Sequence, residues 1–161
     1  MPVDVADLYK RHGAMVKRRA AHLLHDESLA QDVVQEVFLR LWREQDRLVG
    51  GGLASWLYTT ATRMSIDHLR RRAVRANKTP QATDTPPQMP SSRDFGGPDR
   101  NLVLRQVVDG LPEELALVAL YRFVDEMTHD EIASVTGHSR RHVGNLLQRA
   151  ERHFQELRHD R

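Results

Sequence analysis

The sequence predicts an all-α protein built from two small helical domains that a flexible linker joins. Apolar residues recur at helical spacing through residues 1–72 and again through 101–161, and no stretch shows the alternation typical of a strand. The intervening residues 73–100 hold five of the seven prolines and few apolar side chains, so they cannot offset the entropy of ordering by burial. We therefore expect an N-terminal helical bundle at 1–72, a flexible linker at 73–100 and a C-terminal helix-turn-helix domain at 101–161.

The composition sets limits on the class of protein. With 161 residues, 40% of them hydrophobic, the chain can bury a core in each domain. The absence of cysteine excludes disulfides and thiolate metal sites and suits a reducing compartment. No segment of about 18 uncharged apolar residues occurs, and the N-terminus lacks the pattern of a signal peptide. We expect a cytoplasmic protein, with any membrane tether supplied by a partner.

Three helices are predicted in the first domain. The first follows the i, i+3, i+4 pattern of apolar residues from Leu8 to Leu23. Ser28 and Gln31 have the form of a capping box, which predicts that a second helix begins there and runs to about Glu44. The glycines at 50–52 interrupt the pattern, and a third helix is expected from about Ser55 to Arg72.

The second helix has an unusual polar side. One broad stripe is apolar, formed by Ala30, Val33, Val34, Val37, Phe38 and Leu41. The opposite side carries Asp32, Gln35 and Glu36, and Leu39 lies at its centre. An exposed leucine is common, so periodicity alone assigns Leu39 no role.

The third helix is apolar on two sides and strongly basic. Between Arg63 and Lys78 lie six basic residues and a single acidic one, Asp67. Such a helix is either central in a bundle or lends one side to a partner. Arginines beside an aromatic residue and threonines suit single-stranded or melted DNA. Cations near a helix C-terminus can also simply complement the helix dipole, so both readings stay open here.

The C-terminal domain has the pattern of a helix-turn-helix. Helical spacing resumes at Leu102, and Pro112 suits the first turn of the next helix. Thr128 and Glu131 form a second capping box that opens a short helix. A turn containing Gly137 follows, and Ser139 caps a last helix that runs to about Leu157.

The last helix has one apolar and one polar face. Val143, Leu146, Leu147, Ala150 and Phe154 share the first, and we expect them to hold the helix to its domain. Arg141, Asn145, Gln148 and Arg152 lie opposite, with Arg140 at the N-terminal edge. Arginine contacts guanine and asparagine or glutamine contacts adenine in the major groove, whereas Arg152 better suits phosphate. Ordinary solvation of these residues is the alternative, and Gly144 within this helix stays unexplained.

We expect neither a metal or other cofactor nor catalysis. His138 and His142 have ligand-like spacing, but no HExxH motif and no cysteine accompany them. No glycine-rich phosphate loop follows a strand, and no nucleophile and base form a recognised local pattern.

Taken in order, these segments resemble the bacterial RNA polymerase sigma factors of the extracytoplasmic-function (ECF) type, in the sigma-70 family. The stretch AQDVVQEVFLRLW (30–42) is similar to the family's polymerase-binding segment, and WLYTTATRMSIDHLRRR (56–72) to its segment for the promoter −10 element. The stretch MTHDEIASVTGHSRRHVGNLLQRA (127–150) is similar to its −35 reader. The resemblance covers nearly the whole chain, and its three parts occur in the family's order.

This resemblance implies a sigma factor that binds core polymerase and directs promoter-specific initiation. Asp32, Gln35, Glu36 and Leu39 would then contact the coiled coil of the largest polymerase subunit, with Leu39 as the apolar centre of a polar-rimmed patch. The residues implied for the opened −10 strand are Arg63, Asp67, Arg70 and Arg71. Those implied for the −35 element are Arg140, Arg141, Asn145, Gln148 and Arg152. The implied partners are core RNA polymerase, through its coiled coil and flap, promoter DNA, and an anti-sigma factor.

The sequence departs from the family's pattern at several positions. Arg63 stands where relatives commonly have asparagine, and three glycines at 50–52 occupy the loop expected to carry base selection. Gly144 and Leu146 stand where relatives often have basic residues, so the promoter sequence stays open. Two other classes of protein fit parts of the chain: a stand-alone helix-turn-helix transcriptional regulator, and a helical adaptor that binds only proteins.

Overall fold

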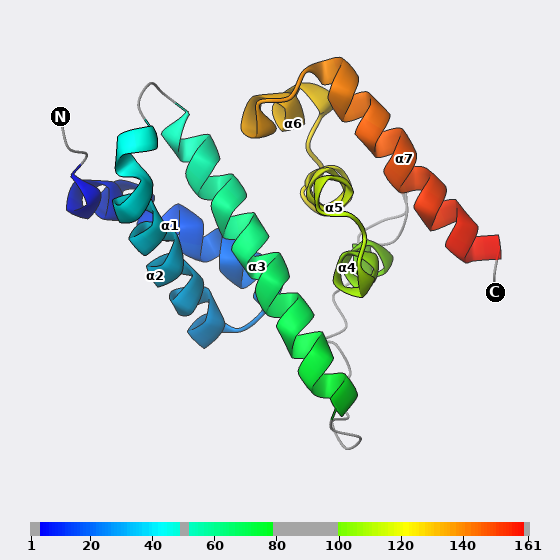
Figure 1. Cartoon of the computed structure of the whole chain (residues 1–161), viewed down its shortest axis with the longest axis horizontal. Coiled ribbons are helices and arrows are strands. Elements are labelled where there is room, and N and C mark those ends of the chain that lie inside the picture. Colours follow the sequence, from blue (N-terminus) through cyan, green and yellow to red (C-terminus); the bar gives the residue numbers. More distant parts are fainter. Residues whose placement is uncertain (1–3, 49–51, 79–99, 160–161) are drawn as a thin grey trace. The chain divides into compact units, whose positions relative to one another are not determined.

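The computed structural model describes residues 4–48, 52–78 and 100–159, and all regular secondary structure in these ranges is helical (Figure 1). The chain divides into two compact units, residues 1–71 and 72–161. Residues up to 71 include α1 (Val5–Leu24), α2 (Glu27–Glu44), the 3-10 helix η1 (Gln45–Arg47) and most of α3 (Leu53–Lys78). The later elements are α4 (Arg100–Asp109), α5 (Glu113–Ala119), the π-helical segment η2 (Leu120–Val124), α6 (His129–Thr136) and α7 (Arg140–His159). The predicted all-α fold is confirmed.

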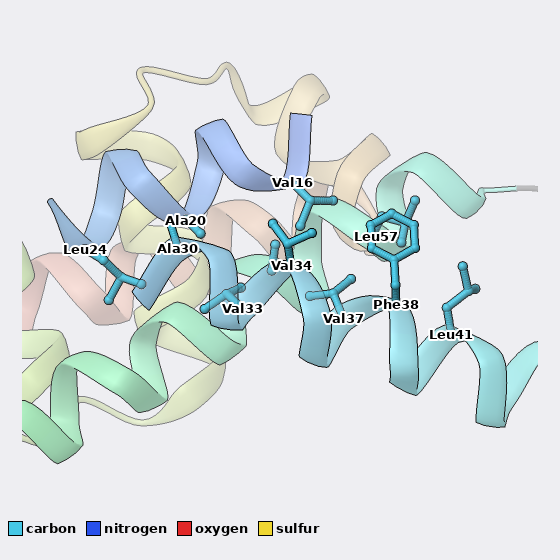
Figure 2. Close-up of a cluster of buried hydrophobic side chains, with 11 residues drawn as sticks. Val16, Ala20, Leu24, Ala30, Val33, Val34, Val37, Phe38, Leu41 and Leu57 are labelled. Atoms are coloured by element: carbon cyan, nitrogen blue, oxygen red, sulfur yellow. The ribbon is translucent and has the colours of Figure 1, made fainter. Parts of the chain in front are cut away.

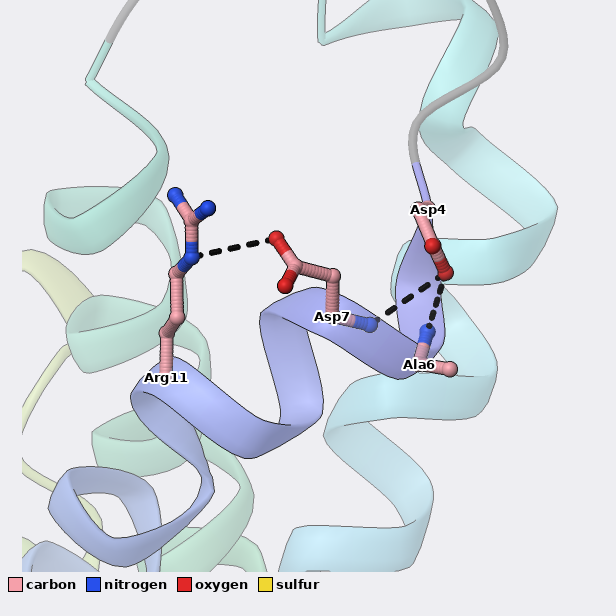
Figure 3. Close-up of polar contacts among 4 residues, drawn as sticks. All are labelled: Asp4, Ala6, Asp7 and Arg11. Carbon is pink, nitrogen blue, oxygen red and sulfur yellow. Dashed lines mark hydrogen bonds and ion pairs between the residues drawn. The ribbon is translucent and has the colours of Figure 1, made fainter.

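The N-terminus of α1 is fixed by a side-chain cap. The Asp4 carboxylate accepts hydrogen bonds from the backbone N–H groups of Ala6 (3.1 Å) and Asp7 (3.2 Å), as Figure 3 shows. Asp7 in turn pairs with Arg11 one turn later, at 3.0 Å between Oδ2 and Nε. These contacts satisfy backbone donors that the first turn of a helix leaves without partners.

The core of the first unit is formed by the inward stripes of α1, α2 and α3. The predicted apolar stripe of α2 is entirely buried, and it packs against Val16, Ala20 and Leu24 of α1 and Leu57 and Ala61 of α3 (Figure 2). The polar side of α2 is therefore left facing outward.

The start of α2 differs from the prediction. Asp26, not Ser28, is the N-cap residue, and its Oδ1 accepts a hydrogen bond from Leu29 N at 3.0 Å. The predicted capping box at Ser28 and Gln31 is wrong, because the helix already begins at Glu27. Aspartate and serine are equally good N-caps, so the local pattern alone could not choose between them.

Helix α3 is longer than predicted at both ends. It begins at Leu53, directly after Gly52, whose φ of 79° is left-handed, and it continues to Lys78. The prediction that the helix ends near Arg72 is therefore wrong by six residues, and residues 73–78 of the predicted linker are helical. The rest of the predicted linker up to residue 99, like the glycines at 50 and 51, lies outside the described residues.

The second unit is organised around α5 and η2. Leu115 to Tyr121 are all buried, and α5 packs against α7 while α4 and α6 contact η2. Pro112 is the N-cap of α5 and does not lie in its first turn. The sequence did not predict the π-helical segment, in which Asp125 N donates to Leu120 O at 3.0 Å.

No helix within residues 4–48, 52–78 and 100–159 is both long enough and apolar enough to cross a bilayer.

Candidate functional site

The outward side of α2 is a polar surface with exposed apolar residues within it. Asp32, Gln35, Glu36 and Leu39 are all exposed, and the Leu39 side chain is 53% exposed. None of the four belongs to the apolar core of the unit. The structure thus places the four residues on one surface, which we call the α2 outer surface.

Trp42 extends this surface, although sequence reasoning did not single it out as a site residue. Its side chain is 60% exposed, the largest value among the large hydrophobic residues in the described ranges. It follows Leu39 by three residues, so the two lie on neighbouring positions of the helix. The same periodicity that placed Leu39 outside could have placed Trp42 at the edge of the apolar stripe.

Glu36 has a neighbour on α3. Its Oε1 lies 3.5 Å from Nε2 of His68, whose side chain is only 12% exposed. This distance is that of an ion pair, but His68 Nε2 makes no hydrogen bond. The contact connects the α2 outer surface to the basic helix α3.

Helix α3 uses one of its apolar sides to hold the first unit together, because Leu57 and Ala61 belong to the core with α1 and α2. Thr62 and Ile66, on another side, are also buried. What remains outside is a narrow stripe that includes the exposed Arg63 and Asp67 and the partly exposed Arg70. Arg71, the fourth predicted residue, is also exposed, one position further round the helix.

A buried arginine of α1 holds the inner side of α3. Arg19 is 4% exposed, and its Nε donates a hydrogen bond to Thr62 Oγ1 at 2.9 Å. Its guanidinium also lies over the ring of Tyr58, at 4.8 Å from the ring centroid. Thr62 Oγ1 donates to Tyr58 O at 2.8 Å. Together these contacts fix the rotation of α3, and hence the direction of its outer stripe.

The helix-turn-helix of the second unit is formed as predicted. Thr128 and Glu131 make both hydrogen bonds of the capping box at the start of α6. Gly137 ends α6 with a left-handed φ of 78°, and Ser139 Oγ accepts from His142 N at 3.1 Å at the start of α7. These local signals determine where α6 begins and ends and where α7 begins.

Helix α7 presents the predicted polar residues to solvent. Arg140, Arg141, Asn145, Gln148 and Arg152 are exposed, whereas the five predicted apolar residues are buried. Arg140 lies 3.6 Å from Asp130 of α6, an exposed pair that contributes little to stability. A helix with this face can make base and phosphate contacts along a DNA groove.

Gly144 lies within α7, and His138 and His142 lie near its N-terminus. A Cβ added at Gly144 would meet no atom within 4 Å, so packing inside the unit does not require glycine there. The rings of His138 and His142 meet edge to face, with their centroids 4.8 Å apart. No group of three or more metal-ligating residues occurs among the residues that the structure describes.

Each of the two units matches the model of a known protein family. The family model "Sigma-70 region 2" matches residues 8–75, which include α2 and most of α1 and α3. The model "Sigma-70, region 4" matches residues 101–154, which include the helix-turn-helix.

Known proteins similar to this chain carry the same family assignment. RNA polymerase sigma factor CarQ of Myxococcus xanthus is 30% identical over 158 residues, which cover 94% of this chain and 86% of CarQ. ECF RNA polymerase sigma factor SigL of Mycobacterium tuberculosis is 34% identical over 118 residues, covering 69% of this chain and 64% of SigL. ECF RNA polymerase sigma factor SigE of Mycolicibacterium smegmatis is 26% identical over 155 residues, covering 94% of this chain. The chain spans only 59% of the length of SigE.

A solved structure with a similar fold is the sigma factor RpoE of Bartonella quintana, crystallised with the anti-sigma factor NepR. The TM-score is 0.52 and the identity 18%, with 98% of this chain and 99% of the other covered. This likeness extends the agreement in fold over both units.

Proposed function

The chain belongs to the sigma-70 family of RNA polymerase sigma factors, as a member of its extracytoplasmic-function type, and on this premise we propose that it directs promoter-specific initiation by core polymerase. In this proposal the catalytic step belongs to the polymerase, and this chain supplies binding and promoter choice. It needs no cofactor of its own for that role.

The observation that carries the proposal is the α2 outer surface. It combines an exposed leucine and an exposed tryptophan with carboxylate and amide side chains. Binding surfaces typically have an apolar centre and a polar rim, and tryptophan is enriched among the residues that dominate binding energy. A stand-alone DNA-binding regulator would have no need for such a surface. We propose that it binds the coiled coil of the largest polymerase subunit, with Leu39 and Trp42 as apolar contacts.

The two units would bind promoter DNA in different states. Helix α7 would lie in the major groove of the −35 element, with Arg140, Arg141, Asn145 and Gln148 near base edges and Arg152 near phosphate. The outer stripe of α3 would hold the opened −10 strand through Arg63, Asp67, Arg70 and Arg71. A base taken out of the stack is read more readily from a rigid helix, which the buried Arg19 contacts provide.

Linking the two units raises the affinity of the whole chain for a promoter. Once one unit is bound, the linker holds the other at high effective concentration near its own site. The polymerase, bound through the α2 outer surface and through its flap, would fix the spacing between them.

We further propose that an anti-sigma factor restrains the chain in the cytoplasm by covering these surfaces. The similar RpoE was crystallised with such a factor, which supports this kind of partner. If that partner is bound to the membrane, it would also tether the chain there.

Reconstituted transcription tests the proposed function. Purified chain plus core polymerase should start transcripts at defined positions on a genomic promoter set, whereas core polymerase alone should not. If folded chain gives no specific starts, but shifts promoter fragments without polymerase, the stand-alone regulator is the better description. If folded chain binds neither DNA nor polymerase, a helical adaptor that binds only other proteins is the better description.

A further inference from the structure

A second surface of the first unit is a groove between α1 and α2, on the side where Gln31 lies. Its volume is about 320 Å³, and its lining is mainly apolar. The floor is formed by Gly13 and Ala14 of α1 and by Val34 of α2. Because neither Gly13 nor Ala14 has a long side chain, another backbone can approach α1 closely at this point.

The rim of this α1–α2 groove is positively charged. Lys10 and Lys17 line it, and no carboxylate is among its lining residues. Lys17 also pairs with the exposed Glu27 at 3.0 Å, an interaction that an incoming carboxylate can replace at little cost. The two lysines are seven residues apart, which is two helical turns or about 10 Å along α1.

An aromatic residue closes one end of the groove. The ring of Tyr9 lies edge-on to Phe38, with 5.1 Å between centroids, and it lies 3.7 Å from the position of a Cβ at Gly13. Tyr9 nevertheless remains 48% exposed. A rigid, half-exposed tyrosine offers a partner both an apolar face and a hydroxyl group.

We propose that the α1–α2 groove binds an acidic amphipathic helix of a protein partner. Large apolar side chains of that helix would cover Gly13 and Ala14, while carboxylates two turns apart would pair with Lys10 and Lys17. This is the helix-in-groove mode, in which anchors recur at i, i+3, i+4 and i+7. A nucleic acid strand fits less well, since its phosphates would match the lysines but leave the apolar floor uncovered.

The groove is distinct from the α2 outer surface, although Gln31 directly precedes Asp32. Its occupancy therefore does not depend on the proposed function, and binding there can be measured without polymerase. A partner in the groove would lie beside bound polymerase.

Three labelled helical peptides of about 20 residues provide the probe, with fluorescence anisotropy on the full chain as the measurement. The first carries Glu at i and i+7 and Leu at i+3 and i+4. The second replaces these Glu residues with Lys, and the third has the first peptide's composition with the Glu residues moved to the opposite face. We expect the first peptide to bind at least tenfold more tightly than the other two.

Variants of the chain locate the binding. The double variant Lys10→Glu/Lys17→Glu should weaken the first peptide at least tenfold and reverse its preference over the second. Ala14→Leu, which fills the floor without changing charge, should weaken it as well. Arg18→Glu, an exposed charge change on α1 outside the groove lining, is the matched control and should have no effect.

Three results would overturn the proposal. One is that none of the peptides binds, or that all three bind equally. Another is that the first peptide binds every variant equally, which would place its site elsewhere. The third is that a 20-nucleotide single strand loses affinity for the double variant while the first peptide does not. Circular dichroism of each variant, all at surface positions, checks that the fold is retained.

Discussion

At the scale of single residues, Leu39 and Leu41 show how strongly position on a helix decides the role of a side chain. The two are separated by one residue, yet Leu41 is fully buried and Leu39 is 53% exposed. Fully burying a leucine side chain stabilises by about 1.5–3 kcal/mol. A partner that covered Leu39 would gain part of this free energy as binding free energy.

We predict that Leu39→Asp abolishes binding to core polymerase and leaves the fold intact. The new carboxylate is solvated in the free chain. In the complex with polymerase it would be buried without a cation or hydrogen-bond donor beside it, which is costly. Binding can be followed by co-migration with core polymerase, and folding by thermal unfolding. The matched control Leu41→Asp should unfold the first unit, and retained affinity in Leu39→Asp would contradict the docking assignment.

Arg141 and Arg152 are both exposed on α7, but we assign them different contacts. Arg141→Ala should lower promoter affinity by roughly 1–3 kcal/mol for the preferred −35 sequence and much less for altered sequences. Arg152→Ala should weaken all sequences alike and reduce the salt dependence of binding. Titrations against a set of mutated −35 elements distinguish the two, and a uniform loss in Arg141→Ala would make it a phosphate contact.

At the scale of elements, α3 shows that the sequence of a helix with two apolar sides does not indicate which side is free to bind a partner. Leu57 and Ala61 belong to the core of the first unit, and Thr62 on another side contacts Arg19 of α1. The proposed DNA contact is therefore left to the stripe that carries Arg63 and Asp67. Arg19 of α1 contacts Thr62 and Tyr58 of α3 and so fixes the direction in which that stripe faces. The side of α3 proposed to bind the opened strand is thus defined by what its other sides contact.

Gly144 gives a prediction for α7. Because a Cβ there meets open space, Gly144→Ala should stabilise the second unit by roughly 0.5–1 kcal/mol through the helix propensity of alanine. We expect promoter affinity to fall at the same time, since the partly exposed backbone at Gly144 would approach the DNA. Urea unfolding and promoter titration measure the two effects. Unchanged affinity would mean that the glycine has no role in binding.

At the scale of the whole molecule, the proposed function depends on the division into two units. The chain divides into compact units at 1–71 and 72–161, and each bears its own candidate nucleic-acid surface. In the proposed function, joining the two surfaces in one chain raises the affinity for a promoter through effective concentration.

Cutting the chain after folding tests this division. A protease site inserted between residues 84 and 95 should leave the unfolding of each unit unchanged. Cleavage should reduce promoter-specific transcription at least tenfold at nanomolar concentration, and micromolar amounts of both pieces should restore part of it. Full activity after cleavage would show that joining the units contributes nothing.

Sequence periodicity was sufficient for the inward stripes of α2 and α7 and for the outward direction of Leu39 and Arg141, because these depend on neighbours within one helix. Thr128, Gly137 and Ser139 were predictable for the same reason, since caps act within a few residues. Only the tertiary structure buried Arg19 of α1 against Thr62 and Tyr58 of α3. It also formed the α1–α2 groove. These features depend on residues far apart in the chain, and the free energy of burying a side chain is decided by which distant surface covers it.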